Sequence, residues 1–210
     1  MPTINLFVNL AVLAVTLLVI VVIALVSRKH IKKQSEIRRL FLEEEEHANN
    51  VRKRDLDPEL YFVPDLSHLP ALPQGDPFKI ERCAKRTIVR FDPPMSNLEL
   101  KKLYGPAQME LIAQYEENYV EFLRCLNEWG ISLTSEGRNA DALKVLEYAI
   151  SLGTEFRTTY KQAADIYAAA ENYSALEALY EQASETLFRD PAVQKHVLSY
   201  VDQKLGEFEA

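Results

Sequence analysis

The chain opens with a long apolar run that contains no charged side chain. Residues 1–27 lack Asp, Glu, Lys and Arg, and residues 6–26 are interrupted only by Asn9 and Thr16. At about 1.5 Å of rise per residue, a helix over residues 6–26 spans roughly 31 Å, which matches the hydrocarbon core of a bilayer. Residues 1–27 are therefore predicted to be a single-pass transmembrane anchor that contacts lipid through residues 4–26.

The residues on either side of this run indicate its direction. No charge precedes the run, whereas Arg28, Lys29, Lys32 and Lys33 follow it. Lys and Arg beside a membrane segment favour the cytoplasmic side, so we expect the N-terminus outside the cell membrane and the remaining chain in the cytoplasm. A cleaved signal peptide would carry its positive charge before the apolar core, and a buried core helix would show a polar face. Both alternatives fit the run less well.

Two segments of different composition follow the anchor. Residues 28–54 mix basic and acidic clusters with a short apolar face at helical spacing, which favours a charged juxtamembrane stalk over an amphipathic helix on the membrane surface. Residues 55–95 contain seven prolines interleaved with large apolar residues. Proline discourages helix, and a flexible tether gains nothing from so many apolar groups. We therefore expect an extended strap that packs on the folded domain.

The strap ends in a basic stretch, residues 79–91, with the sequence KIERCAKRTIVRF. Its pattern fits either a short strand or a helical turn. Its basic side chains form either a docking site for a partner or, as the simpler interpretation, salt bridges to an acidic domain. These side chains are Lys79, Arg82, Lys85, Arg86 and Arg90.

Helical periodicity begins after Ser96 and continues almost to the end of the chain. Ser96 and Glu99 have the spacing of a capping box, and apolar residues then recur every three or four positions. Glycine, asparagine and proline separate the periodic runs. The predicted helices cover residues 97–104, 107–134, 140–152, 158–170, 174–187 and 191–205. The fold class is expected to be mainly α, with a helical domain over residues 96–210.

Two of the predicted helix pairs are related by a shift of 34 residues. Leu126, Trp129, Gly130, Leu133, Leu146 and Ala149 fall on Tyr160, Ala163, Ala164, Tyr167, Tyr180 and Ala183. Small residues at such positions let paired helices approach closely, and the bulky ones fill the space between them. The segment GRNADALKVLEYAISLG, with Gly137 at its turn and Ala142 following, is the most specific part of the pattern.

Over residues 123–190 this pattern resembles the tetratricopeptide repeat. The resemblance implies an α-solenoid of about two helix pairs, with a solvating helix at its end. The second unit departs from the family because Leu176 stands where the family usually has Ala, and neither unit ends in the family's proline. Two pairs are few for a stable array, so the helix from residue 107 and the strap are expected to complete the core.

The resemblance also implies a binding module whose first helices line a concave groove for peptide segments. Carried onto this sequence, the groove exposes Arg124, Asn127, Glu128, Ile131, Thr158, Lys161, Gln162 and Asp165. Some family members grip a partner's C-terminal carboxylate, but Ile131 and Ala192 break that pattern here. The groove is either open to a partner or filled by the strap.

Charge and composition argue against nucleic acid and against catalysis. Residues 1–42 carry a net charge of +5, which leaves −12 for the remainder of a chain whose total is −7, whereas a polyanion needs a basic surface. The four histidines have no ligand-spaced partner, and six glycines leave little room for a phosphate loop. We expect no enzyme activity, no cofactor, no metal and no small-molecule substrate. Cys83 and Cys125, without CxxC spacing, fit reduced thiols in a cytoplasmic domain, whereas the reverse topology would allow a disulfide between them.

These observations predict a membrane-tethered scaffold or adaptor that binds another protein through a small helical-repeat domain. The alternative is an accessory subunit that contacts a larger membrane complex through its transmembrane helix, for which Asn5 and Asn9 could supply polar contacts. A compact protein with a one-helix anchor suits a bacterium.

Overall fold

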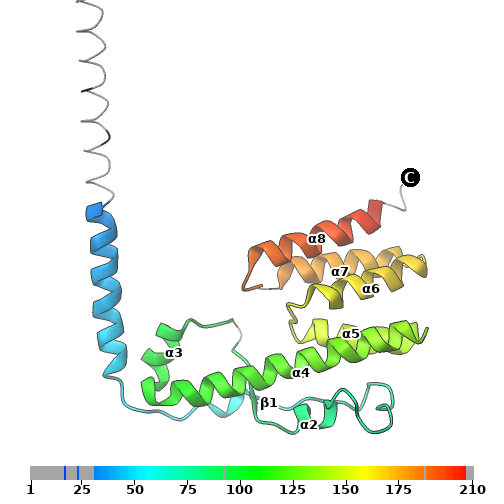
Figure 1. Ribbon diagram of the computed structural model, residues 1–210, viewed down its shortest axis with the longest axis horizontal. Coiled ribbons are helices and arrows are strands. Elements are labelled where there is room, and N and C mark those ends of the chain that lie inside the picture. The colour runs from blue at the N-terminus through cyan, green and yellow to red at the C-terminus, as the bar shows by residue number, and fades with distance from the viewer. Residues whose placement is uncertain (1–16, 18–22, 24–30, 92, 187, 207–210) are drawn as a thin grey trace, which may run out of the picture.

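The computed structural model describes residues 17, 23, 31–91, 93–186 and 188–206, and over these residues the chain is mainly helical (Figure 1). The predicted anchor, residues 1–27, lies outside the described residues except for Leu17 and Ile23. None of the helices formed by the described residues combines the length and the apolarity that crossing a membrane requires.

A helix over residues 31–49 occupies most of the predicted stalk and stands apart from the helical stack in Figure 1. Its C-terminal end is tied to α3 (Asn97–Tyr104). Ala48 is fully buried there, and Lys101 Nζ of α3 lies 3.3 Å from Glu45 Oε1. The stalk helix is therefore joined to the domain at one end.

The predicted capping box at the start of α3 is present. Glu99 N donates to Ser96 Oγ at 3.3 Å, and Ser96 N donates to Glu99 Oε2 at 2.7 Å. The helix ends at Gly105, whose φ is +78°. A Cβ at this position would lie 2.8 Å from the carbonyl oxygen of Arg52, so glycine lets the segment after the stalk pass closely. A 3₁₀ turn, η2 (Pro106–Gln108), then leads into the long helix.

The proline-rich strap contains four short elements, which are η1 (Pro58–Leu60), β1 (Tyr61–Phe62), α2 (Ile80–Ala84) and β2 (Ile88–Val89). The two strands pair antiparallel, with Tyr61 opposite Val89. The basic stretch, residues 79–91, thus holds both a helical turn and a strand, whereas its sequence pattern alone left the choice open.

The strap packs on the long helix α4 (Met109–Ser135) and contributes to the core. Ile80, Cys83 and Ile88 are almost completely buried in the main hydrophobic cluster. Six further apolar side chains of the strap pack partly buried against the same cluster: Phe62, Leu66, Leu69, Leu72, Phe78 and Ala84. The strap runs along one side of α4 in Figure 1, with α6, α7 and α8 on the other side.

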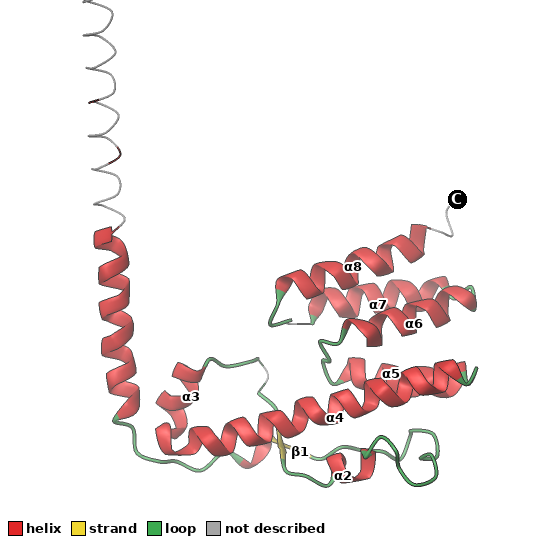
Figure 2. Cartoon of the chain, in the orientation of Figure 1, coloured by secondary structure: helices red, strands yellow, loops and turns green. Residues whose placement is uncertain are grey.

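Four more helices follow α4, joined by the short loops visible in Figure 2. They are α5 (Asn139–Ser151), α6 (Arg157–Ala169), α7 (Tyr173–Glu185) and α8 (Pro191–Gly206). From α3 onwards every helix boundary agrees with the predicted one within two residues. Consecutive helices pack on one another, and α6 also contacts α4 and α8.

The small residues singled out in the sequence lie at helix contacts. Ala149, Ala164 and Ala183 are fully buried. Gly130 of α4 is the tightest case, because a Cβ there would lie 2.5 Å from Leu146 Cδ2 of α5. The α4–α5 pair therefore owes its close approach to glycine.

We predict that Gly130→Ala lowers the free energy of unfolding by about 1 kcal/mol. Alanine gains up to about 1 kcal/mol of helix propensity, but overpacking against the buried Leu146 side chain costs about 1–3 kcal/mol. The matched control is Gly206→Ala, since no atom lies within 4 Å of the added Cβ at that position. Denaturant unfolding of the full chain in detergent micelles compares the two, and equal stability would contradict the close-packing account.

We also predict that Ile88→Ala, in the strap, costs about 2–5 kcal/mol of folding free energy, because it leaves a cavity in the main core. Val63→Ala in the same strap removes a side chain that is 83% exposed, and should change stability by less than about 0.5 kcal/mol. Denaturant midpoints of the two variants test this. A similarly small effect at Ile88 would mean that the strap is dispensable for the domain.

Candidate binding site

The residues predicted to line a groove lie on α4 and α6, which are side by side at this face. Thr158 and Thr159, at the start of α6, donate from their hydroxyls to Asn127 Oδ1 of α4, at 2.8 and 2.9 Å. Asn127 is only 8% exposed. Its amide oxygen is therefore used to hold α4 against α6 and is not offered to a partner.

The same face continues from α6 onto α8. Tyr200 OH donates to Asp165 Oδ1 at 2.7 Å, and Lys204 Nζ lies 3.6 Å from the same oxygen. Lys161 Nζ stands 4.3 Å from the centroid of the Tyr200 ring, within cation–π range. Asp165 and Lys161 thus connect α6 to a third helix that the sequence-based groove did not include.

We call this surface the α4–α6–α8 face. It consists of Arg124, Asn127, Glu128, Ile131, Thr158, Lys161, Gln162, Asp165, Tyr200 and Lys204. Arg124, Glu128, Thr158 and Lys161 are exposed, whereas Ile131 and Gln162 are half-buried between them. The surface therefore combines exposed charges of both signs with two half-buried side chains, one apolar and one polar.

The strap lies on a different side of α4 from this face. Phe62 stacks edge-on to Tyr119, and Cys83 Sγ contacts Cys125 Sγ. Asn118 and Glu121 of α4 also contact the strap. At 100° per residue, the mean direction of these four strap-contacting residues is about 125° around the helix from the mean direction of Arg124, Asn127, Glu128 and Ile131. The sequence left open whether the strap fills the groove. In the structure the strap packs elsewhere on α4 and does not fill it.

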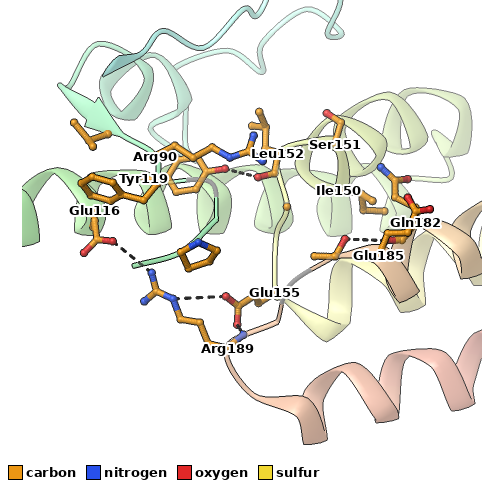
Figure 3. A pocket seen from close by; sticks show the side chains of 15 residues that line it. Arg90, Glu116, Tyr119, Ile150, Ser151, Leu152, Glu155, Gln182, Glu185 and Arg189 are labelled. Atoms are coloured by element: carbon orange, nitrogen blue, oxygen red, sulfur yellow. Dashed lines mark hydrogen bonds and ion pairs between the residues drawn. The ribbon is translucent and has the colours of Figure 1, made fainter. Parts of the chain in front are cut away.

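A separate cleft of about 290 Å³ opens where the end of the strap meets α4 and the loops after α5 and α7 (Figure 3). The C-terminal turns of α5 and α7 both border it, so backbone carbonyls face the space. Tyr119 OH donates to the carbonyl oxygen of Leu152 at the end of α5. Arg90 reaches in from the strap, with a guanidinium nitrogen 3.8 Å from where a Cβ on Gly153 would stand.

Arg189 crosses this cleft between two carboxylates. Its guanidinium lies 3.7 Å from Glu116 Oε1 of α4 and 3.8 Å from Glu155 Oε1 of the α5–α6 loop. Its backbone N–H also donates to Glu155 Oε2 at 3.0 Å. Arg189 thus ties two of the three glutamates that line the cleft, and the cleft joins four segments of the chain. We regard it as a structural junction.

Metal-binding clusters and the size of the cleft bear on what these surfaces could hold. The described residues include no cluster of three or more His, Cys, Asp or Glu side chains able to hold a metal ion. At about 290 Å³ the cleft is at the lower limit for small-molecule sites.

The other basic residues singled out in the sequence are divided among several contacts. Arg86 Nη1 lies 3.1 Å from Glu121 Oε2 of α4, a salt bridge between the strap and the helical domain, whereas Lys85 pairs with Glu81 inside α2. Among the membrane-proximal basic residues, Lys32 and Lys33 are exposed on the stalk helix, and Arg28 and Lys29 fall outside the described residues.

Sequence reasoning missed the part of the binding face on α8 and the cleft residues Glu116, Glu155 and Arg189. Tyr200 and Lys204 were assigned to a solvating end helix, but their contacts with α6 arise from how the helices stack. The three cleft residues come from three separate segments of the chain, and no local spacing connects them.

Comparisons of the chain with protein-family models, with curated proteins and with solved structures found no match. The resemblance to the tetratricopeptide repeat accordingly rests on the spacing of the residues themselves.

We predict that Asn127 acts in folding. Asn127→Ala should cost about 1–3 kcal/mol, because the buried Thr159 hydroxyl loses its acceptor. Glu128→Ala, one residue further on α4 and exposed, should stay within about 0.5 kcal/mol of wild type. Thermal and denaturant unfolding distinguish the two. If Asn127→Ala proved as stable as Glu128→Ala, Asn127 could be counted among the residues available to a partner.

Proposed function

We propose that the protein is an adaptor tethered to the cell membrane by residues 1–27, which holds a cytoplasmic helical domain near the bilayer to bind another protein. The α4–α6–α8 face is the binding surface. The observation that carries the proposal is that α4 and α6 present the exposed charges of Arg124, Glu128 and Lys161 on one face, while the strap packs on α4 away from it. A face left uncovered beside a well-packed core is where a partner segment can lie.

The composition of this face fits recognition of a protein segment. Arg124 and Lys161 place positive charge next to Glu128, with the half-buried Ile131 between the helices. Charges of both signs around an apolar side chain make binding specific and fix the orientation of the partner, because complementary charges attract the partner and like charges repel it. Such a surface suits a partner segment with charges of both signs.

The helical pairs support a repeat of the tetratricopeptide type. The α4–α5 and α6–α7 pairs follow one another in the chain, and most of the matched residues 34 positions apart are both buried, although Tyr180 is half-buried where Leu146 is fully buried. Leu126 and Tyr160 are both fully buried, as are Ala149 and Ala183. In such arrays the first helix of each pair lines one face, which here gives α4, α6 and α8.

The tether is supported by the sequence of residues 1–27 and by the stalk that follows. The stalk helix, residues 31–49, leaves the domain at one end and carries exposed Lys32 and Lys33 towards the proposed anchor. Basic residues in this position are attracted to anionic headgroups on the cytoplasmic side. A binding domain that catalyses no reaction would act by keeping its partner near the membrane.

We predict that Arg124→Glu lowers partner binding at least tenfold, because it reverses one of the exposed charges of the face. Lys195→Glu, the control, makes the same change in net charge at an exposed position on α8 outside the α4–α6–α8 face. The full tagged chain is cross-linked in its native cells, and the proteins recovered with each variant are quantified by mass spectrometry. Equal loss or equal retention in the two variants would refute binding through this face.

A chimera with residues 1–27 replaced by an unrelated transmembrane helix separates the adaptor from the accessory subunit. Partner recovery that survives the exchange and depends on Arg124 supports the adaptor. Recovery that is lost with the exchange, while the chimera remains in the membrane fraction, supports an accessory subunit that acts through its anchor.

A further inference from the structure

The only two cysteines of the chain are in contact. Cys83 Sγ of α2 lies 3.2 Å from Cys125 Sγ of α4, although the residues are 42 positions apart in the sequence. Both thiols are unoxidised, and both are buried. The spacing in the sequence gave no hint of this pair, because the contact depends on where the strap crosses α4.

Contacts on both sides of the pair fix this crossing. Asn118 Nδ2 of α4 donates to the carbonyl oxygen of Thr87 at 2.9 Å, just after α2. Arg86 pairs with Glu121 one turn before Cys125. The neighbouring Ile80 and Ile88 are buried in the main core. The two sulfur atoms therefore meet through a register that several independent contacts impose.

We propose that Cys83 and Cys125 form a disulfide that staples the strap to α4, with a small-molecule disulfide as the oxidant. One cysteine thiolate attacks the disulfide RSSR, which forms a mixed disulfide and releases one RS⁻. The second cysteine then attacks the protein sulfur of the mixed disulfide, which closes the Cys83–Cys125 bond and releases the second RS⁻. Two electrons pass to RSSR, and the two cysteine protons end on the two RSH products.

The buried position of the pair makes the reaction depend on opening of the strap. Burial and the neighbouring Cys83 thiol raise the pKa of Cys125 to about 12, so this group is protonated at neutral pH while the strap is closed. A thiolate is the attacking species, and RSSR has to reach it. Lifting α2 from α4 exposes both thiols, and closing it again brings them together for the second step.

The staple would act on the fold without touching the binding face. It links two segments across a loop of 42 residues, which restricts the unfolded chain and stabilises the folded one. Cys125 contacts Cys83 of the strap and is buried, whereas Arg124 and Glu128 of the binding face are exposed. The inference therefore does not depend on the proposed adaptor function, and a failure of one leaves the other intact.

The test uses the full chain in detergent micelles, incubated with oxidised glutathione and then freed of it. Wild type should lose the mass of two hydrogen atoms and both free thiols. Its thermal midpoint should rise by about 5–10 °C, because the bridge closes a long loop. Cys83→Ser and Cys125→Ser should carry at most one glutathione each and show no such rise.

Two results would overturn the staple. One is retention of both free thiols by the folded chain under conditions in which the urea-unfolded chain is oxidised. The other is a bridge that forms but leaves the thermal midpoint unchanged or lowers it, which would mean that the native contact does not fit a bond.

The role of strap opening is tested by the rate of bridge formation. Arg86→Ala removes the salt bridge from the strap to Glu121, and should speed the reaction several-fold. Lys85→Ala is the matched control, because Lys85 pairs with Glu81 inside α2 itself. Equal rates in the two variants would show that opening of α2 does not control the reaction.

Discussion

The structure depends on the burial of α4 from two directions. One side of this helix packs against α5 and α6, with Gly130 pressed against Leu146. The other side carries Tyr119 and Cys125, which would be left to solvent in a helical array that began at α4. The strap covers this second side with Phe62, Cys83 and the buried Ile88, so the proline-rich segment is part of the core.

This division of α4 leaves the α4–α6–α8 face, the proposed binding surface, uncovered by the strap. Because the strap takes another side of α4, Arg124, Glu128 and Lys161 stay exposed on the face shared by α4, α6 and α8. Some residues at this face serve the fold. Asn127 joins α4 to α6, and Asp165 joins α6 to α8. The proposed binding surface is thus held in shape by its own hydrogen bonds, which limits the rearrangement a partner would have to induce.

The same covering of α4 brings Cys83 and Cys125 together. A disulfide between them would fix the strap in the position that the core already favours, whereas the reduced pair leaves the strap held by packing and by the Arg86–Glu121 salt bridge. The proposed disulfide would therefore make the stability of the strap depend on the redox environment. The binding face lies on another side of the same helix.

Local patterns in the sequence determined the helices and their close contacts. The apolar spacing, the Ser96 capping box and the breaks at Gly105, Gly137 and Pro191 place helix boundaries within two residues, because capping and turn chemistry act over a few neighbouring positions. The 34-residue shift likewise identified small residues such as Ala149 and Ala183, which are buried. The membrane anchor rests on the sequence alone, since residues 1–27 lie outside the described residues except for two.

Only the tertiary structure decided how these elements face one another. The side of α4 that the strap covers, the inward turn of Asn127, the contact of Tyr200 with α6 and the meeting of the two thiols all join residues 31 or more positions apart. Such contacts arise from the packing of many side chains at once. No short spacing encodes them, and a helical pattern states which residues share a face without stating what that face will touch.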